Sequence, residues 1–251
     1  MLTSQRKKTI LAILKKTGHV EAKTLAADFA VSEDTVRRDL RELAAEGQLQ
    51  RVHGGAMRAS PAVADLAQRQ AISSSGKAAI AAAAAGLVSA GQLIILDGGT
   101  TCAELARQLP LDMPLTVATH SPSIALALAG HAQIEVILIG GRLYRHSMVA
   151  VGAGALEALR HIRADTYFMG VTGVHPEAGY STGDLEEAHI KRALSAHAAE
   201  TVVLASSEKL NAASRYPIGA LGMAGTLIVE RDTPRDLIDA LGRDGMVIIT
   251  A

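Results

Sequence analysis

The sequence predicts two domains: a small helix-turn-helix domain with a two-stranded wing, and a larger α/β domain with a mostly parallel sheet. Within residues 1–58, short helical patterns are followed by alternating apolar and basic residues, which favours the first domain. From residue 77 to residue 251, apolar runs alternate with helical patterns, which is typical of a parallel sheet covered on both faces. Residues 59–76 lack clear periodicity and are predicted to be the linker.

The most informative stretch is VSEDTVRRDLREL, residues 31–43. Ser32 is a favourable N-cap, and Glu33 and Asp34 place negative charge at the positive end of the predicted helix. A shorter predicted helix, about residues 22–29, ends at a connection of the length found in helix-turn-helix pairs, whose second helix enters the major groove. The side chains available for DNA contact are Ser32, Thr35, Arg37, Arg38 and Arg41.

The flanking segments complete this predicted domain. The run LQRVHGGA, residues 49–56, predicts the wing and would place Arg51 and His53 beside the phosphate backbone. A first helix over about residues 4–16 is predicted to bury its leucines and isoleucine and to leave Arg6 and the lysines in solvent. The alternative is that residues 31–43 form an ordinary amphipathic helix whose arginines are a solvated face.

Charge and composition favour a nucleic-acid partner for the first domain. The net charge of zero hides an asymmetry, because residues 1–60 carry 11 Lys and Arg against 7 Asp and Glu, and the remainder carries 14 against 18. The single cysteine, Cys102, excludes an intrachain disulfide and fits a reducing cytoplasm, and we expect a small core residue there rather than a redox sensor. Scattered histidines predict no metal site, no cofactor is expected, and the sequence offers no apolar run that predicts a membrane partner.

Seven apolar runs are predicted to be strands of the α/β domain: residues 93–97, 115–119, 135–139, 166–171, 201–205, 226–230 and 246–250. In such sheets, ligands bind outside the carboxyl ends of the strands. The residues that follow each strand are therefore the candidate site.

The first of these strands leads into a glycine-rich turn, Asp97-Gly98-Gly99-Thr100-Thr101. Glycines allow close approach of a ligand, and a new helix offers free N–H groups to an anion, so the turn suits a phosphate. The alternative is a tight turn that needs glycine and a threonine cap. Glu187 is a further candidate for effector binding; the alternative is that it pairs with Lys191, four residues later on the same predicted helix, as surface charges. Other strand ends and nearby loops add Thr119, His120, Ser121, Gly140, Gly141, Arg142, Gly173 and Lys209.

These motifs together resemble the DeoR family of bacterial transcription regulators. Residues 2–58 carry QRKKTILAILKK, VSEDTVRRDL and RVHGGA in order, and residues 77–229 carry LDGGTTCAELA, ATHSPSIA and VILIGGRL. Glu187 and Lys209 fall where the family has Glu and Lys. The resemblance implies an effector held by residues 97–101 with Lys209 nearby. It also implies a sensor domain that is related in fold to ribose-phosphate isomerases and binds phosphorylated sugars. His120 stands where asparagine is usual, and SSEK replaces a more usual Asp-x-Ser-Lys, which leaves the preferred sugar open.

The expected function is a DNA-binding transcription regulator, a repressor of carbohydrate-metabolism genes that acts as a homo-oligomer on double-stranded operator DNA and responds to a phosphorylated sugar. One alternative is a sugar-phosphate isomerase-like enzyme with a DNA-binding head, in which Asp97, Glu187 and Lys209 would be acid and base groups. Another is an activator or a constitutive DNA-binding protein whose pocket is vestigial. We expect no catalytic residues, because the motifs resemble sensors rather than enzymes.

Overall fold

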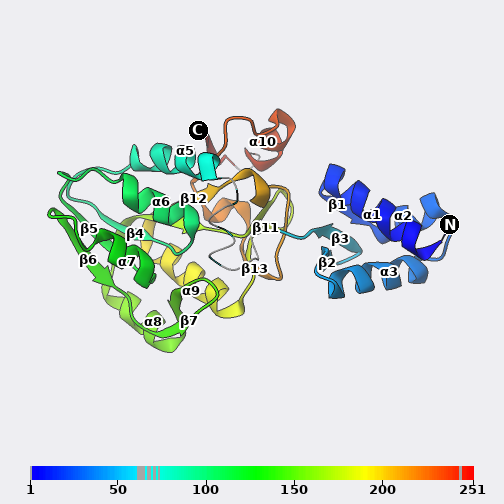
Figure 1. Ribbon diagram of the computed structural model, residues 1–251, viewed down its shortest axis with the longest axis horizontal. Coiled ribbons are helices and arrows are strands. Elements are labelled where there is room, and N and C mark those ends of the chain that lie inside the picture. Colours follow the sequence, from blue (N-terminus) through cyan, green and yellow to red (C-terminus); the bar gives the residue numbers. More distant parts are fainter. Residues whose placement is uncertain (1, 61–65, 67–68, 70–71, 73, 243–244) are drawn as a thin grey trace.

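A computed structural model describes residues 2–60, 66, 69, 72, 74–242 and 245–251, and its two domains lie end to end (Figure 1). The smaller domain contains a three-stranded antiparallel sheet of order β1-β3-β2, and its last two strands form the predicted wing. The first strand was not predicted. The elements are α1 (Thr3–Thr17), β1 (His19–Glu21), α2 (Ala22–Phe29), α3 (Glu33–Ala45), β2 (Leu49–Val52) and β3 (Gly55–Arg58).

Helix α3, which the sequence predicts to be the second helix of a helix-turn-helix pair, forms as expected. The hydroxyl of Ser32 accepts a hydrogen bond from the backbone N–H of Thr35 at 3.2 Å, which satisfies one of the free donors of the first turn. Val36, Leu40 and Leu43 are buried against α1 and α2, so the helix is held by one apolar stripe.

The prediction that Arg6 is solvated was wrong. Arg6 on α1 is only 5% exposed and forms a two-pronged ion pair with Asp39 on α3, from Nε to Oδ2 and from Nη2 to Oδ1 at 3.1 Å. A charged side chain that is removed from water needs an opposite partner, and each residue supplies it to the other. The pair therefore connects the first helix to the recognition helix.

The larger domain is built on a seven-stranded parallel sheet of order β15-β14-β12-β9-β4-β5-β6. All seven predicted strands belong to this sheet, so the prediction of a mostly parallel α/β domain is confirmed. The strands are β4 (Leu93–Leu96), β5 (Leu115–Thr119), β6 (Ile134–Leu138), β9 (Ala164–Gly170), β12 (Ala198–Ala205), β14 (Thr226–Val229) and β15 (Val247–Thr250).

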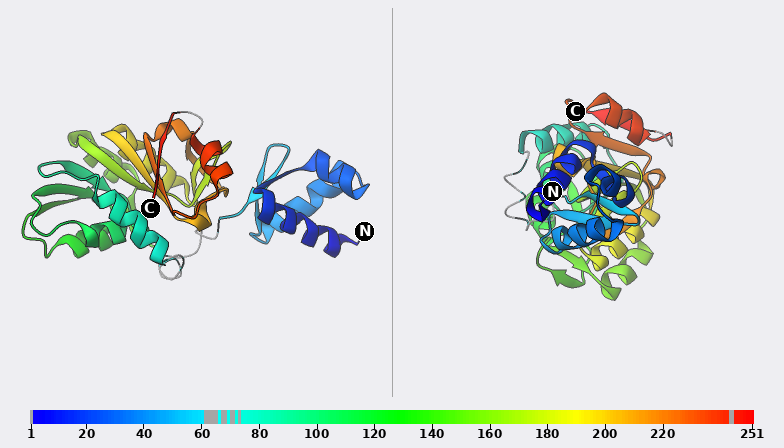
Figure 2. Two further views of the ribbon diagram at one scale, coloured as in Figure 1. Left: turned by 90° about the horizontal axis from the view of Figure 1, so that it is seen from above. Right: turned by 90° about the vertical axis from the view of Figure 1, so that its right-hand side faces the viewer.

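Helices cover both faces of this sheet (Figure 2). One buried cluster joins α5 (Ser74–Ala85), α6 (Thr100–Gln108) and α7 (Pro122–Leu128) to one face, and a second joins α8 (Ala153–Ala158), α9 (Leu185–Ala196) and α10 (Arg235–Leu241) to the other. In β4, Ile94 and Leu96 belong to the first cluster and Ile95 to the second, because successive side chains of a strand point to opposite faces.

Two small antiparallel sheets were not predicted. One contains β7 (Arg142–Tyr144) and β8 (Val149–Val151), and the other contains β10 (Gly173–His175), β11 (Gly179–Thr182) and β13 (Tyr216–Gly219). Within the described residues, short 3₁₀ turns cover Leu159–His161, Ser207–Lys209 and Leu221–Met223.

The predicted linker, residues 59–76, lies in large part outside the described residues, and α5 begins within it, at Ser74. Among the residues that are described, no helix combines the length and the apolar character needed to cross a bilayer.

The buried ion pair generates a prediction about stability. Asp39→Leu should leave the Arg6 guanidinium buried without its partner and lower the free energy of unfolding of the smaller domain by about 3–5 kcal/mol. The double variant Arg6→Met with Asp39→Leu should regain most of this loss. Urea unfolding followed by circular dichroism measures both.

A matched control is Arg37→Ala, which breaks an exposed pair with Glu33 and should cost less than about 1 kcal/mol. A double variant as unstable as Asp39→Leu alone would show that the cost lies in packing and not in an unpaired charge.

Candidate functional site

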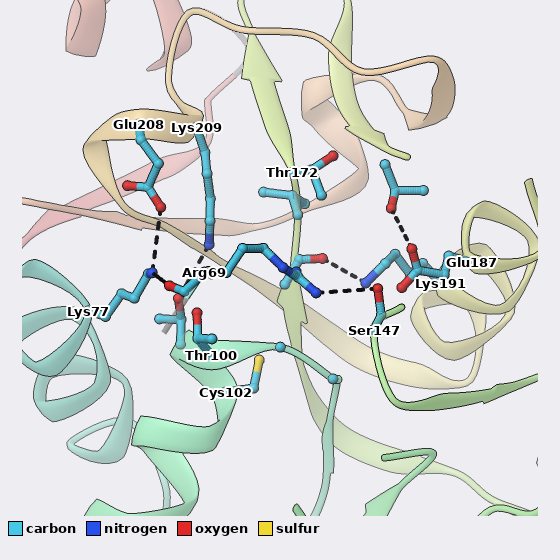
Figure 3. A pocket seen from close by; sticks show the side chains of 16 residues that line it. Arg69, Lys77, Thr100, Cys102, Ser147, Thr172, Glu187, Lys191, Glu208 and Lys209 are labelled. Atoms are coloured by element: carbon cyan, nitrogen blue, oxygen red, sulfur yellow. Dashed lines mark hydrogen bonds and ion pairs between the residues drawn. The ribbon is translucent and has the colours of Figure 1, made fainter. Parts of the chain in front are cut away.

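A small polar pocket lies at the carboxyl ends of β4 and β9, beside the first turn of α6 (Figure 3). Parallel strands end at one edge of their sheet, which brings together loops that are distant in sequence. The lining residues are Arg69, Lys77, Gly98, Gly99, Thr100, Thr101, Cys102, Ser147, Gly170, Val171, Thr172, Thr182, Glu187, Lys191, Glu208 and Lys209.

The fully buried carboxylate of Asp97 organises one wall of this pocket. Its Oδ1 accepts hydrogen bonds from the backbone N–H of Gly98 and from Nε2 of His120, both at 2.8 Å. Its Oδ2 accepts from the backbone N–H of Gly170 at 2.9 Å and from the ammonium of Lys191. Asp97 thus ties together the ends of three strands and helix α9, and it does not itself line the pocket.

The alternative interpretation of Glu187 and Lys191 as a surface pair is wrong, because both side chains are buried. Lys191 turns to Asp97 and to the carbonyl of Gly170, and Glu187 accepts a hydrogen bond from the hydroxyl of Thr182 at 3.1 Å. Both residues lie on α9, whose N-terminus is capped by the Asp184 carboxylate.

The Asp97–Lys191 pair stays ionised in this setting. Burial alone would raise the pKa of Asp97, but the charge of Lys191 and the hydrogen bond from His120 lower it well below its usual value. Burial alone would lower the pKa of Lys191, and Asp97 raises it overall. Each charge therefore depends on the other for its stability in the interior.

The first turn of α6 offers hydrogen-bond donors to the pocket. Its N-cap, Gly99, has no side chain to accept from the free N–H groups of the turn, and its φ of 102° lies in the region that favours glycine. Thr100 and Thr101 line the pocket beside these groups. Gly170 is confined from behind, since a Cβ there would lie 2.9 Å from the carbonyl oxygen of Gly98.

Cationic side chains from separate elements converge on this turn (Figure 3). The ammonium of Lys209 donates to the hydroxyl of Thr101 at 3.3 Å, and the ammonium of Lys77 donates to the carbonyl oxygens of Arg69 and Ile72. Burial lowers the pKa of Lys209 to about 8 and also lowers that of Lys77, with Glu208 opposing both shifts.

The lining carries four cationic side chains, Arg69, Lys77, Lys191 and Lys209, against the carboxylates of Glu187 and Glu208. Lys191 is paired with Asp97, so the comparison for a ligand is between three cations and two carboxylates. Such an excess, next to free helix N–H groups, suits an anionic ligand. The sequence prediction had not assigned Arg69, Lys77 or Ser147 to the site. Arg69 extends across the pocket and donates to the hydroxyl of Ser147 at 3.4 Å (Figure 3).

Six residues predicted to bind the effector line the pocket: Gly98, Gly99, Thr100, Thr101, Glu187 and Lys209. Thr119, His120 and Ser121 are buried behind it, where Thr119 donates to the carbonyl of Leu96 and His120 contacts Asp97. The lining does not include Gly140, Gly141, Arg142 or Gly173. The first three lie exposed at the end of β6 and the start of β7, and Gly173 lies against the carbonyl of Ala212.

Cys102 faces the interior and contacts the carbonyl of Phe168. Burial raises the pKa of its thiol to about 12, so the reactive thiolate is disfavoured. The structure thus places Cys102 as a core residue. In the described part of the chain, no three His, Cys, Asp or Glu side chains are grouped as metal ligands would be.

The second candidate surface is the smaller domain. Arg37, Arg38 and Arg41 are exposed on α3, and Arg51 and His53 are exposed on the wing. Arg37 is held by Glu33, with Nη2 to Oε2 at 2.7 Å. The hydroxyls of Ser32 and Thr35 lie 2.9 Å apart at the start of α3.

Comparison with known proteins identifies both domains. The DeoR C-terminal sensor domain matches residues 72–231, and the DeoR-like helix-turn-helix domain matches residues 6–62. Ribose 5-phosphate isomerase A from Methanocaldococcus jannaschii is similar to 53% of this chain and 53% of its own, at 20% identity and a TM-score of 0.41.

The sequence relatives are similar over nearly their whole length, and their names are those of regulators and not of enzymes. A putative aga operon transcriptional repressor of Escherichia coli O157:H7 is 31% identical over 98% of this chain and 93% of its own. The regulator GlpR of Haloferax volcanii is 30% identical over 99% and 98%, and the repressor GlcR of Bacillus subtilis is 30% identical over 99% and 96%. With both of its domains matched in order, the chain belongs to the DeoR family of transcriptional regulators.

Proposed function

We propose that this regulator is a repressor of carbohydrate-metabolism genes, and that a phosphorylated sugar bound in the sensor domain weakens its hold on operator DNA. The observation that carries the proposal is the convergence of buried cations on the uncapped first turn of α6. A phosphate group matches this set because it accepts hydrogen bonds from backbone N–H groups and carries about two negative charges at neutral pH.

In this proposal the phosphate lies against Gly98, Gly99, Thr100 and Thr101, with Lys209 beside it. The N–H groups and hydroxyls of the turn donate to its oxygens. The carboxylate of Glu187 is available to accept hydrogen bonds from sugar hydroxyls. The residues proposed to support this cradle from behind, without touching the ligand, are Asp97, Thr119, His120 and Ser121.

The DNA contacts are proposed on α3 and the wing. Arg37, Arg38 and Arg41 would approach the major groove, with Ser32 and Thr35 at the N-terminal end of the helix. Arg51 and His53 would contact the phosphate backbone from the wing. Exposure of these cations on adjacent elements supports the arrangement.

We propose that the chain divides into a DNA-binding domain over residues 1–58, a linker over residues 59–76 and a sensor domain over residues 77–251. We also propose that the protein acts in the cytoplasm as a homo-oligomer, which would present recognition helices to repeated half-sites of an operator. The names of two relatives, which are called repressors, support repression rather than activation.

One experiment tests the function as a whole. An operator is first selected from random-sequence duplexes by repeated binding to the protein, and a thermal-shift panel of sugar phosphates and inorganic phosphate then identifies ligands. A ligand should lower operator affinity in fluorescence anisotropy by about 5- to 150-fold at constant ionic strength. Steady turnover of the ligand would instead support an isomerase, and a rise in operator affinity would identify a co-repressor.

The arginines of α3 generate the next prediction. Arg37→Ala or Arg38→Ala should weaken operator binding by about 1–3 kcal/mol and relax specificity at one base pair if the side chain contacts a guanine. If it contacts a phosphate, affinity should fall on all sequences and the salt slope should shrink by about one. Anisotropy titrations at several salt concentrations separate these outcomes.

Arg107→Ala is the matched control, since Arg107 lies on α6 and pairs on the surface with Glu104. An Arg37→Ala, Arg38→Ala double variant that binds operator as the control does would remove α3 from the proposal.

The lowered pKa of Lys209, about 8, generates a prediction about pH. A lysine is charged below its pKa, so the ammonium is largely present at pH 7 and largely lost at pH 9. A phosphate ester, with a second pKa near 6, keeps its charge over this window. A sugar phosphate identified by the thermal-shift panel should therefore bind about tenfold more weakly at pH 9 than at pH 7 in isothermal titration.

The arginine of Lys209→Arg keeps its charge at both pH values, so the affinity of this variant for the sugar phosphate should fall less between pH 7 and pH 9. An equally steep fall in this variant would assign the effect to another group, of which Lys77 is the first candidate because its pKa is also lowered.

A further inference from the structure

One short stretch of the sensor domain touches both the pocket and the DNA-binding domain. This stretch, residues 207–214, is called the coupling segment below. It begins with the 3₁₀ turn Ser207–Lys209, which places Glu208 and Lys209 in the pocket lining. Directly after that turn, the chain reaches the smaller domain.

The first interdomain contact of the coupling segment is made by Asn211. Its amide Nδ2 donates to the carbonyl oxygen of Thr17 at 3.4 Å, at the C-terminus of α1. The side chain occupies the space beside Gly18, because a Cβ on Gly18 would lie 2.1 Å from Nδ2 of Asn211. Asn211 has a φ of 51°, a conformation that asparagine tolerates better than most residues.

The second contact is a backbone pairing. The N–H of Ala213 donates to the carbonyl of Arg58 at 3.1 Å, and Ala213 forms a parallel bridge with Ala59. Arg58 ends β3, a strand of the wing sheet. The coupling segment thus contacts α1 and the wing sheet, and both of these elements pack against α3.

The coupling segment has little room to absorb movement. Ser214 is fixed by a hydrogen bond from its N–H to the hydroxyl of Ser181 and by a hydroxyl contact of 2.7 Å with Thr172, which lines the pocket. A chain spans at most about 3.6 Å per residue, so Asn211 lies within about 7 Å of Lys209 along the backbone. A displacement of the Lys209 backbone would therefore be passed over a short distance to the interdomain contacts.

We propose that the coupling segment transmits pocket occupancy to the DNA-binding domain, and that Asn211 is the positioning residue that makes the transmission possible. When a phosphate draws Lys209 away from Thr101, the segment moves Asn211 and Ala213 against Thr17 and Arg58. The orientation of the recognition helix changes with them. This inference rests on the proposed function and supplies its internal route.

The test is a double-mutant cycle that needs no ligand. Lys209→Met removes the charge and the Thr101 contact, and Asn211→Gly removes the amide while allowing the same backbone conformation. Binding of the full-length protein to the selected operator duplex is measured for both single variants and the double variant. Lys209→Met should change operator affinity at least fivefold in the presence of Asn211 and less than twofold in its absence.

A matched pair of variants separates transmission from simple damage. Asn211→Asp keeps the size of the side chain but presents an acceptor to the Thr17 carbonyl, and it should also abolish the effect of Lys209→Met. Arg215→Ala alters an exposed residue just beyond the coupling segment and should leave the effect intact. Each variant should have a melting temperature close to that of the protein that carries the same residue 209 and is otherwise unchanged. Its thermal shifts with ribose 5-phosphate and with inorganic phosphate should also match those of that protein.

An effect of Lys209→Met that is unchanged by both Asn211 variants overturns the proposal, and so does the absence of any effect of Lys209→Met on operator affinity. Failure of the proposed function is recognised separately. In that case no operator duplex is selected, or neither phosphate probe shifts the melting temperature of the parent protein.

Discussion

The arrangement of the sensor site depends on one buried negative charge. A carboxylate that is wholly removed from water is tolerated only when its oxygens are satisfied, and Asp97 meets this condition with four donors. Those donors come from the turn after β4, from the residue after β5, from the end of β9 and from α9. A single side chain therefore fixes how these four segments meet, and the pocket is the space left in front of them.

The buried positive charges of the pocket are compensated less completely than the negative charge of Asp97. Lys191 is neutralised by Asp97, but Lys209 and Lys77 have weaker compensation and carry lowered pKa values. Desolvated ammonium groups without a full counter-charge raise the free energy of the folded protein. In the proposed phosphate site, an entering anion would relieve this cost, so part of the binding free energy would already be stored in the folded protein.

Local patterns were sufficient to predict the parallel sheet, because its strands are apolar on both faces and stand out from the helices between them. The same patterns predicted α3 and its N-cap, Ser32. They failed at Arg6 and Lys191, since helical periodicity assigns a charged residue to the surface unless its partner is known. The partner of Lys191 is 94 residues away in sequence. The short antiparallel strands were not predicted for a related reason: runs of three or four residues acquire their conformation from tertiary pairing.

The ion pair between α1 and α3 has a consequence for how such proteins diverge. Arg6 and Asp39 are each acceptable only in the company of the other, so a lineage that replaces one must pass through an intermediate with a stranded charge. Substitutions at the two positions are therefore expected to be inherited together, as charged pairs or as apolar pairs. By contrast, Arg37 and Arg38 on the exposed face of the same helix are free to vary one at a time. With Arg37 and Arg38 in the proposed DNA-reading role, the domain could change its DNA sequence preference without disturbing the ion pair between α1 and α3.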